Sequence, residues 1–183
     1  MAKIKNGQFL ISEPFLLDDA FRRSVIMMLD HNKNESFGLI INKKMPYKIS
    51  EINLGIIRDD IDLYFGGPVD TNRVFFVHKT KELKNAIPIG NGLYWNGDID
   101  EMKAMLEIEY ILPEDIRFYL GYSGWGKDQL KEELNEKSWI LSDLETDIVF
   151  NTKTDDELWK TALESLGEPY AEMIHYPINP QLN

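Results

Sequence analysis

The sequence predicts an α+β protein, one compact domain in which a mixed, mostly antiparallel β core carries flanking helices. Short apolar segments follow one another in the first half, segments with helical spacing come mostly in the second half, and no regular strand–helix alternation is present. The chain of 183 residues is close to the size of one folding unit of about 150 residues. We therefore expect residues 1–183 to form a single domain.

The first forty residues predict a strand, a turn and a hairpin. Residues 9–11 are apolar and end before Pro14, which removes a hydrogen-bond donor from a strand. Residues 20–23 follow two aspartates and read as one helical turn. The apolar segments 25–29 and 37–42 flank a polar turn, which is typical of a β-hairpin. The continuous apolar run at 25–29 favours a strand buried on both faces.

The middle of the chain predicts further short strands. Residues 50–57 have weak helical spacing, and residues 63–65 and 74–77 read as strands. Residues 87–89 and 93–95 flank a Gly-Asn-Gly sequence, and these residue types tolerate a positive φ angle. We expect the chain to turn back on itself there.

The second half predicts two helices around a strand. Asp98 and Glu101 have the spacing of a capping box, which begins a helix that we expect to continue to about Glu109. Residues 116–120 read as a strand. The glycine-rich segment 121–126 reads as a turn that leads into a helix ending near residue 136.

The C-terminal part predicts two strands and the most amphipathic helix. Residues 139–141 and 148–150 are strand candidates, and Thr154 begins a second capping box. The helix that follows ends at Gly167 and carries an apolar stripe expected to face the core. The stripe consists of Leu158, Trp159, Ala162, Leu163 and Leu166. Prolines after the helix predict an irregular tail over residues 168–183.

The charge of the chain limits the partners it can have. It carries 20 basic and 31 acidic residues, a net charge of −11. Residues 1–97 hold 13 basic and 11 acidic residues, whereas residues 98–183 hold 7 and 20. The acidic second half disfavours contact with nucleic acid through that half, because phosphate contacts need clustered lysine and arginine. The first half stays possible, but it has no basic stripe. The absence of cysteine excludes disulfides, thiolate nucleophiles and cysteine-based metal sites.

Two further features bear on localisation. The N-terminal residues lack the apolar core of a signal peptide, and no apolar run approaches the ~18 residues that span a bilayer. We therefore expect a cytoplasmic protein with no membrane partner.

The segment after residue 120 matches a phosphate-binding loop only in part. Gly121 to Lys127 fits the first seven positions of that loop. Asp128 stands where the loop needs Ser or Thr to hold magnesium, and its negative charge repels a triphosphate. Nucleotide binding is therefore disfavoured.

Ser123 in the same segment allows a hydrolase hypothesis. A nucleophile elbow needs a glycine two positions before and after the serine; Gly121 satisfies the first, but Trp125 replaces the second. No spacing ties a histidine base to the serine. The candidate bases are His31, His78 and His175. The chain has neither a His-x-x-x-His pair nor a calcium-loop pattern, so no metal or other cofactor is expected, and His78 reads as a structural histidine.

Six ordered segments carry a family resemblance. They are Gly7-x-Phe9-Leu10-Ile11-Ser12-x-Pro14, Phe21-x-Arg23-Ser24-Val25-Ile26, Gly38-Leu39-Ile40-Ile41-Asn42, Gly66-Gly67-Pro68-Val69 with Val77-His78, Gly121-Tyr122-x-Gly124-Trp125-x-x-x-Gln129-Leu130-x-x-Glu133, and Trp159-x-x-Ala162-Leu163-x-x-Leu166-Gly167. In this order they resemble the YqgE/AlgH family of bacterial proteins and cover nearly the whole chain. Phe37 stands where a smaller residue or a glycine-rich turn is usual, and Lys127-Asp128 replace the small residues or proline expected after Gly-Trp-Gly.

The resemblance implies a compact α+β domain with a mixed β core, and it implies little chemistry, because the family is largely uncharacterised. Its members are often described as transcriptional regulators on the basis of a genetic link to exopolysaccharide control. That link does not establish DNA binding, and the net charge of −11 disfavours it further.

We therefore expect a non-enzymatic binding or regulatory protein that recognises a small molecule or another protein. Loops at strand ends carry function on a rigid scaffold, and the candidate surface is chosen from such positions. It consists of Arg23, Ser24, Asn42, Gly66, Gly67, His78, Tyr122, Trp125, Gln129 and Glu133. In this surface Arg23 would supply charge, Asn42 and Gln129 hydrogen bonds, and Trp125 an apolar platform.

Three alternatives stay open. The same ten residues would fit a purely structural role, in which they hold turns and helix caps. The other functional hypotheses are a transcriptional regulator acting on DNA and a Ser/His hydrolase around Ser123. The sequence leaves the oligomeric state and the identity of the ligand or partner open.

Overall fold

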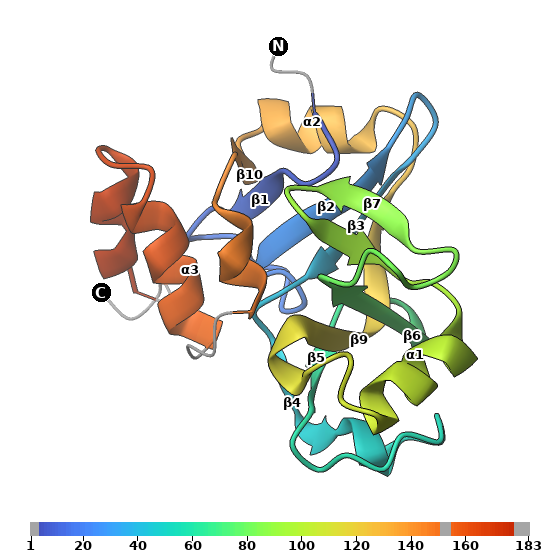
Figure 1. Ribbon diagram of the computed structural model, residues 1–183. Coiled ribbons are helices and arrows are strands. Elements are labelled where there is room, and N and C mark those ends of the chain that lie inside the picture. Colours follow the sequence, from blue (N-terminus) through green and yellow to red (C-terminus); the bar gives the residue numbers. More distant parts are fainter. Residues whose placement is uncertain (1–3, 151–154, 178–183) are drawn as a thin grey trace.

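The computed structural model describes residues 4–150 and 155–177, and these contain ten strands, three α-helices and four short 3₁₀ helices (Figure 1). The strands are β1 (Phe9–Ser12), β2 (Val25–His31), β3 (Ser36–Ile40), β4 (Lys44–Lys48), β5 (Asp62–Phe65), β6 (Val69–His78), β7 (Ile87–Gly90), β8 (Leu93–Trp95), β9 (Ile116–Trp125) and β10 (Trp139–Ser142). The helices are α1 (Ile99–Glu107), α2 (Gln129–Asn135), α3 (Asp155–Glu164), η1 (Ile49–Glu51), η2 (Pro113–Asp115), η3 (Thr146–Phe150) and η4 (Tyr170–His175). None of these helices has the length and apolar character needed to cross a bilayer.

One ten-stranded sheet runs through the molecule, and its main path has the order β10-β1-β2-β3-β9-β6-β8-β7. Strand β4 pairs with β5, and β5 pairs with β9. All of these pairs are antiparallel except β5 with β9. Both predicted hairpins are present, as β2–β3 and β7–β8. The mixed, mostly antiparallel sheet with flanking helices is therefore confirmed.

Strand β9 is shared by the two halves of the sheet. Its first part lies between β5 and β6, with Tyr119 opposite Tyr64 on one side and Phe75 on the other. Its last part pairs with β3, where Gly124 stands opposite Phe37. A single strand therefore joins β1, β2, β3 and β10 to β5, β6, β7 and β8.

The predicted turn at residues 121–126 is wrong, because β9 continues through this segment to Trp125. Gly121 has a φ of +69°, which bends the strand while its pairing continues. Helix α2 begins only at Gln129, and Asp128, with a φ of +62°, makes no side-chain cap. The segment is thus a strand and its exit, and not a phosphate-binding loop directly in front of a helix.

Two glycines after β5 let the backbone cross β9 at very short range. A Cβ atom added to Gly66 would lie 2.3 Å from the carbonyl oxygen of Gly121, and one added to Gly67 would lie 2.2 Å from the carbonyl carbon of Tyr122. Side chains cannot be placed at such distances, so glycine is required at both positions. The Gly66 carbonyl also accepts the Ile40 N–H at 2.9 Å, which ties β3 to the crossing.

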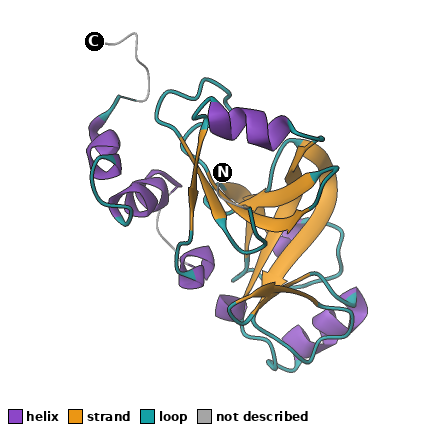
Figure 2. Ribbon diagram, turned by 90° about the horizontal axis from the view of Figure 1, so that it is seen from above, coloured by secondary structure: helices purple, strands orange, loops and turns teal. Residues whose placement is uncertain are grey.

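The curved sheet buries three apolar clusters, and an α-helix packs on each (Figures 1 and 2). Helix α3 supplies most of the predicted stripe to the first cluster, helix α1 contributes to the second, and helix α2 contributes to the third. The buried helical side chains are Leu158, Trp159, Ala162 and Leu163 of α3, Met102 and Leu106 of α1, and Leu130 of α2. Burial of these apolar faces confirms the predicted helices.

Three local predictions are wrong. Of residues 50–57 only the first two are helical, within η1, because Gly55 takes a φ of +75° and Ile57 is 94% exposed, so no apolar stripe supports a longer helix. Residues 148–150 belong to the 3₁₀ helix η3, from which Val149 enters the first cluster without strand pairing. Within the expected irregular tail at 168–183, η4 is helical and packs on the first cluster through apolar side chains, whereas residues 178–183 lie outside the described part of the chain.

The two predicted capping boxes have different outcomes. Asp98 caps α1, since its Oδ1 accepts the N–H groups of Asp100 at 3.1 Å and Glu101 at 2.9 Å. The Glu101 carboxylate, however, accepts the Lys84 N–H at 2.7 Å and does not complete the box. The predicted cap at Thr154 lies outside the described residues.

Replacement of Gly66 by alanine tests the crossing of β5 and β9. We expect Gly66→Ala to lower the free energy of unfolding by about 3 kcal/mol, because the new methyl group overlaps the Gly121 carbonyl. Urea denaturation followed by circular dichroism measures this. The matched control is Gly126→Ala, where the nearest atom lies 3.9 Å from the added Cβ, and it should change stability by less than about 0.5 kcal/mol. Equal effects of the two changes would contradict the assignment.

Candidate ligand-binding site

The structure places the ten candidate residues in four local groups. Arg23, Ser24 and Asn42 lie where β2 begins and β3 has ended; Gly66, Gly67 and Tyr122 lie at the crossing of β5 and β9; His78 ends β6; Trp125, Gln129 and Glu133 lie where β9 leads into α2. Within these groups most polar side-chain atoms contact other residues of the protein. Only part of the predicted surface therefore has polar groups that are available to contact a ligand.

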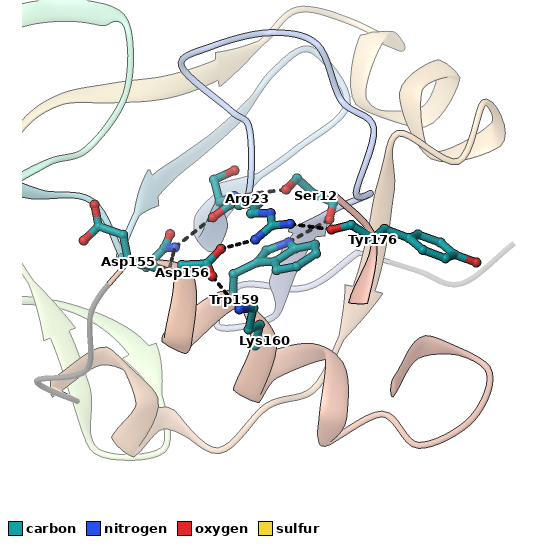
Figure 3. Close-up of polar contacts among 9 residues, drawn as sticks. Ser12, Arg23, Asp155, Asp156, Trp159, Lys160 and Tyr176 are labelled. Carbon is teal, nitrogen blue, oxygen red and sulfur yellow. Dashed lines mark hydrogen bonds and ion pairs between the residues drawn. The ribbon is translucent and has the colours of Figure 1, made fainter. Parts of the chain in front are cut away.

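Arg23 holds the C-terminal helices against the sheet (Figure 3). Its guanidinium pairs with the Asp156 carboxylate, donates to the Tyr176 carbonyl at 2.7 Å and lies 4.8 Å from the centroid of the Trp159 ring. Burial alone would raise the pKa of Asp156, but hydrogen bonds from Lys160 and Arg23 hold that pKa below its usual value. The positive charge of Arg23, which the sequence predicts to contact a ligand, therefore contacts other residues of the protein instead.

Asn42 and Ser24 complete this junction. The Asn42 Oδ1 accepts the first backbone N–H of β2 at 2.8 Å, and its Nδ2 donates to the carbonyls of Arg23 at 2.9 Å and Asp155 at 2.7 Å. Ser24 is buried, and its hydroxyl donates to the Phe21 carbonyl at 2.7 Å. One amide therefore connects β2, the segment after β3, and the start of α3, which is a structural role.

His78 is buried, and both of its ring nitrogens are used. Nε2 lies 2.8 Å from the Asn96 carbonyl oxygen, and Nδ1 lies 3.2 Å from the Thr80 backbone nitrogen. A carbonyl only accepts and a backbone N–H only donates, so the imidazole is neutral with its proton on Nε2. Burial lowers the pKa of His78. This residue holds the chain after β6 and β8 in place, as a structural histidine does.

Ser123 is not placed to act as a nucleophile. It lies inside β9, is fully buried, and donates its hydroxyl to the Gly66 carbonyl at 3.2 Å. A serine nucleophile needs an accessible hydroxyl beside a base. His78 is bound elsewhere, and His31 Nδ1 lies 2.7 Å from the Ser36 hydroxyl oxygen. The position of Ser123 therefore does not support a hydrolase that uses this serine as its nucleophile.

Glu133 is the centre of a polar cluster below the end of β9. Its Oε2 accepts the indole N–H groups of Trp125 at 2.8 Å and Trp139 at 2.7 Å, and its Oε1 accepts the Gln129 amide at 2.9 Å. The Gln129 side chain in turn accepts the Gly126 N–H at 3.0 Å. One carboxylate thus fixes two tryptophans and joins α2 to β9 and β10.

A cavity of about 720 Å³ opens where the end of β9 meets the β2–β3 and β7–β8 hairpins. Of the ten candidate residues, Tyr122 and Trp125 line it. Gly124, opposite Phe37 in the ladder of β3 and β9, also lines the cavity. The Tyr122 ring folds over this glycine, since a Cβ on Gly124 would lie 2.9 Å from that ring. The volume is in the range of about 300–1,000 Å³ that is usual for small-molecule sites.

Aromatic rings from three strands line this cavity. The centroid of Phe37 of β3 lies 4.6 Å from that of Tyr122 of β9 and 5.4 Å from that of Trp95 of β8. Phe75 of β6 supports the group from behind, 5.3 Å from Phe37. Packing against one another fixes the orientation of the rings, so the cavity wall is preformed.

Trp95 carries a buried indole N–H with no hydrogen-bond acceptor among the described residues. The other three tryptophans donate their indole N–H to oxygen atoms of Glu133 or Ser12. A buried donor without an acceptor costs about 1–3 kcal/mol. The Arg23 Nε–H and the Tyr119 hydroxyl are likewise buried without a partner among the described residues, so an unpaired donor does not by itself mark the cavity.

The surface predicted from the sequence includes only two of the residues that line this cavity. Tyr122 and Trp125 were included in the predicted surface, whereas Phe37, Trp95 and Asp30 were not. The rings come together because β9 pairs with β3 and β6, and β6 pairs with β8, and most of these strands are far apart in the chain.

Fold and cavity together define an α+β protein in which a mixed sheet carries a ligand-sized, aromatic-lined hollow beside its central strand. The AlgH-like family model matches residues 9–171. The chain belongs to this family, which confirms the resemblance seen in its sequence.

Relatives and solved structures agree with this assignment. A UPF0301 protein of Bacteroides thetaiotaomicron is 43% identical over 178 residues, which cover 97% of this chain and 90% of the relative. A UPF0301 protein of Cytophaga hutchinsonii is 36% identical and is covered over its full length. The solution structure of the AlgH protein from Pseudomonas aeruginosa has a TM-score of 0.73 at 24% identity and covers 97% of this chain and 98% of that one. A crystal structure from Corynebacterium diphtheriae has a TM-score of 0.77 at 18% identity, with 96% and 94% covered. The two solved structures show the same fold.

Removal of the Glu133 carboxylate tests the polar cluster. We expect Glu133→Ala to lower the free energy of unfolding by about 3 kcal/mol, because two indole donors lose their acceptor. The control is Glu132→Ala on the exposed side of the same helix, which removes the same charge. Urea denaturation compares both with the unchanged protein. A loss no greater than that of the control would show that the indole bonds contribute little.

The pH dependence of stability tests the state of His78. A pKa below 6.5 in the folded protein means that the unfolded chain binds the proton first as the pH falls. We therefore expect stability to decrease as the pH falls below about 6.5, and His78→Gln to remove this part of the decrease. Urea midpoints between pH 7 and 5 measure it, and an NMR titration of the His78 ring should give a midpoint below 6.5. A midpoint above that value would refute the neutral assignment.

Proposed function

We propose that this protein is a non-enzymatic binding protein, and that its ligand is a small molecule held in the aromatic-lined cavity at the end of β9. The observation that carries the proposal is a cavity of about 720 Å³ that the aromatic rings of Phe37, Trp95 and Tyr122 line. Ligand sites are mostly apolar hollows with a few polar groups that orient the ligand. The lining of the cavity likewise combines apolar and aromatic side chains with a few polar groups.

The rim of the cavity supports the proposal. Val69 and Ile87 line it and are 38% and 45% exposed, although both are apolar. Exposed apolar side chains around a hollow are a common mark of a binding site, because a ligand covers them. A ligand that enters between these two side chains would reach the rings of Phe37 and Tyr122.

A catalytic role is disfavoured by the groups at the cavity. Ser36 and His31 form a pair across the hairpin, with 2.7 Å between the hydroxyl oxygen and Nδ1. A nucleophilic pair of this kind needs a third group that orients the imidazole. The hydrogen bonds of the described residues include no carboxylate in that position, and Ser36 is only 6% exposed. We assign this pair to the hairpin, and the proposal includes no reaction.

Three other candidate residues support the cavity without lining it. Glu133 holds Trp125, which lines the cavity, and Gly66 and Gly67 allow β9 to reach it. A direct contact with DNA is not part of the proposal, because the net charge is −11. A regulatory role would then depend on the ligand or on a protein partner that responds to it.

Filling the cavity tests the proposed function. A set of small aromatic and aliphatic fragments is titrated into the ¹⁵N-labelled protein, and the indole N–H resonance of Trp95 reports binding. We expect several fragments to shift this resonance and Val69→Trp, which places a large side chain at the rim, to weaken them about tenfold or more. The indole resonances of Trp139 and Trp159, which donate to Glu133 and Ser12, monitor the fold.

The matched control is Ile108→Trp, which changes a 74% exposed aliphatic residue outside the cavity in the same way. It should leave fragment binding unchanged. If no fragment shifts the Trp95 resonance, or if both variants reduce binding equally, the cavity is not the ligand site.

A further inference from the structure

We propose that an open edge of β6 forms a second binding site, and that this site takes an uncharged, extended peptide segment of a partner protein. The site is a cleft of about 590 Å³ between the middle of β6, the segment after η1 and the start of α1. Its lining residues are different from those of the aromatic-lined cavity. The proposal therefore does not depend on the ligand of that cavity.

The cleft lies where β8 leaves the edge of β6. Strand β8 pairs only with the last two residues of β6. Asn96, with a φ of +49°, and Gly97, with a φ of +137°, then turn the chain away, and the next residue, Asp98, donates its N–H to the Lys84 carbonyl at 2.8 Å. Before those last two residues, the described chain gives β6 no partner strand on this side.

The hydrogen bonds around β6 show which of its backbone groups lie at the open edge. Phe76 donates its N–H to the Asn96 side chain at 3.1 Å and accepts the Asn96 N–H at 2.8 Å, so its backbone groups point away from β9. Backbone groups two residues apart in a strand point the same way, and those of Val74 therefore also face this edge. Leu120, opposite Val74 in β9, agrees with this, because its carbonyl accepts the Gly66 N–H at 2.8 Å from the other side. Within the described residues, the N–H and C=O of Val74 are thus left without a partner.

Asn96 ends the pairing of this edge and leaves one donor free. Its backbone N–H and its Oδ1 are bonded to Phe76, and its carbonyl oxygen lies 2.8 Å from His78 Nε2. These contacts fix the side-chain amide, whose Nδ2 makes no hydrogen bond in the part of the chain that the structure describes. Asn96 is half-buried and lines the cleft, and its Nδ2 is not a buried atom, so a ligand can reach it.

The walls of the cleft supply apolar surface beside these polar groups. Ile52 and Leu54 come from the segment after η1, Ile99 from α1, and Leu120 from β9. Together with Val74 they are half-buried side chains at the border of the second cluster. An apolar side chain of a ligand would extend this cluster and cover them.

The polar residues of the lining favour an uncharged ligand. Asn53, Thr71 and Asn72 are exposed and offer neutral hydrogen-bonding groups. Arg73 is the one charged residue that lines the cleft, but its guanidinium lies 5.1 Å from the centroid of the Phe75 ring. Phe75 belongs to the first cluster, on the opposite face of β6 from the walls of the cleft. The charge of Arg73 is therefore not directed at a ligand in the cleft.

An extended peptide matches this combination of groups. A residue in an added strand has one N–H and one C=O, which can pair with the C=O and N–H of Val74. A further carbonyl of the peptide can accept from Asn96 Nδ2, and an apolar side chain can pack on Leu54 and Ile99. A hydrocarbon ligand would leave the backbone groups unpaired, and an ion would lack an opposite charge.

Capped tripeptides of the form acetyl-Ala-Xaa-Ala-amide test the site, with leucine, phenylalanine or aspartate as the central residue. Each is titrated into the ¹⁵N-labelled protein up to about 10 mM, because ligands of this size bind weakly. The backbone N–H resonance of Val74 and the side-chain amide resonances of Asn96 report binding. We expect the leucine and phenylalanine peptides to shift them, and the aspartate peptide to bind at least about tenfold more weakly, because its carboxylate would face apolar walls.

An N-methylated peptide separates backbone pairing from apolar contact. The leucine peptide with a methyl group on each backbone nitrogen of its three residues keeps its side chains but loses the donors of a strand. It should bind at least about tenfold more weakly than the parent peptide.

Two variants of the protein test the cleft itself. Asn96→Asp keeps an oxygen that accepts the Phe76 N–H and a residue type that tolerates a positive φ, but it removes the free donor. Asn53→Trp places a large side chain in the cleft from an exposed position. Each should weaken the leucine peptide about tenfold or more.

The matched control is Asn135→Trp, the same change at an exposed position of α2 that lines neither the cleft nor the cavity. It should leave peptide binding unchanged. The indole resonances of Trp139 and Trp159, which donate to Glu133 and Ser12, show that each variant is folded.

The outcomes also separate this proposal from the proposed function. The peptide site is wrong if no peptide shifts the Val74 and Asn96 resonances, if the methylated peptide binds as well as its parent, or if either cleft variant binds no more weakly than the control. Peptide shifts confined to the Trp95 indole would place the peptide in the cavity and likewise overturn the site. Fragment binding at Trp95 is measured independently, so either site can fail while the other stands.

Discussion

The close crossing of two backbones at Gly66 and Gly121 is the constraint on which the rest of the fold depends. A side chain at Gly66 would overlap the Gly121 carbonyl, and the Gly66 carbonyl itself accepts hydrogen bonds from β3 and from Ser123. Because the backbones approach so closely, β9 can pair with β5 and β6 over its first part and with β3 over its last part. The two halves of the sheet therefore share a strand, and the three clusters of the core form around it. The cavity is a direct result, since its walls come from both halves.

Polar residues elsewhere in the molecule are used to hold elements together. Arg23 connects β2 to α3 and η4, Asn42 connects β2 to the start of α3, and Glu133 connects α2 to β9 and β10. Buried or half-buried polar groups are stabilised only when they have partners, and most polar atoms of these three side chains have partners within the chain. Residues that resemble functional groups in the sequence are for this reason mostly structural. Among the described residues, three buried donors lack a partner, and they are the Trp95 indole N–H, the Arg23 Nε–H and the Tyr119 hydroxyl.

The proposed ligand site combines features that no single segment of the sequence contains. A glycine in β9 leaves room, a tyrosine two residues earlier covers it, and a phenylalanine in β3 stacks on that tyrosine. A bulge in β2 brings a carboxylate opposite the phenylalanine, and the β7–β8 hairpin supplies the tryptophan. Each of these residues has an ordinary local role in its own strand. Their chemistry as a site depends on the register of the ladders, in which a shift of one residue would turn the side chains to the other face.

The sequence by itself determined the elements whose signals are local. The hairpins, the apolar strand β2, the Asp98 cap and the buried stripe of α3 follow from turn residues, alternation and helical spacing, and the family follows from ordered motifs along the whole chain. Tertiary structure decided the rest. Local spacing made residues 121–126 a turn, but pairing with β3 made them a strand, because glycine permits both and only the neighbouring strand selects one. The same holds for the candidate surface, since hydrogen-bond partners distant in the chain determined which of its polar groups are satisfied within the protein.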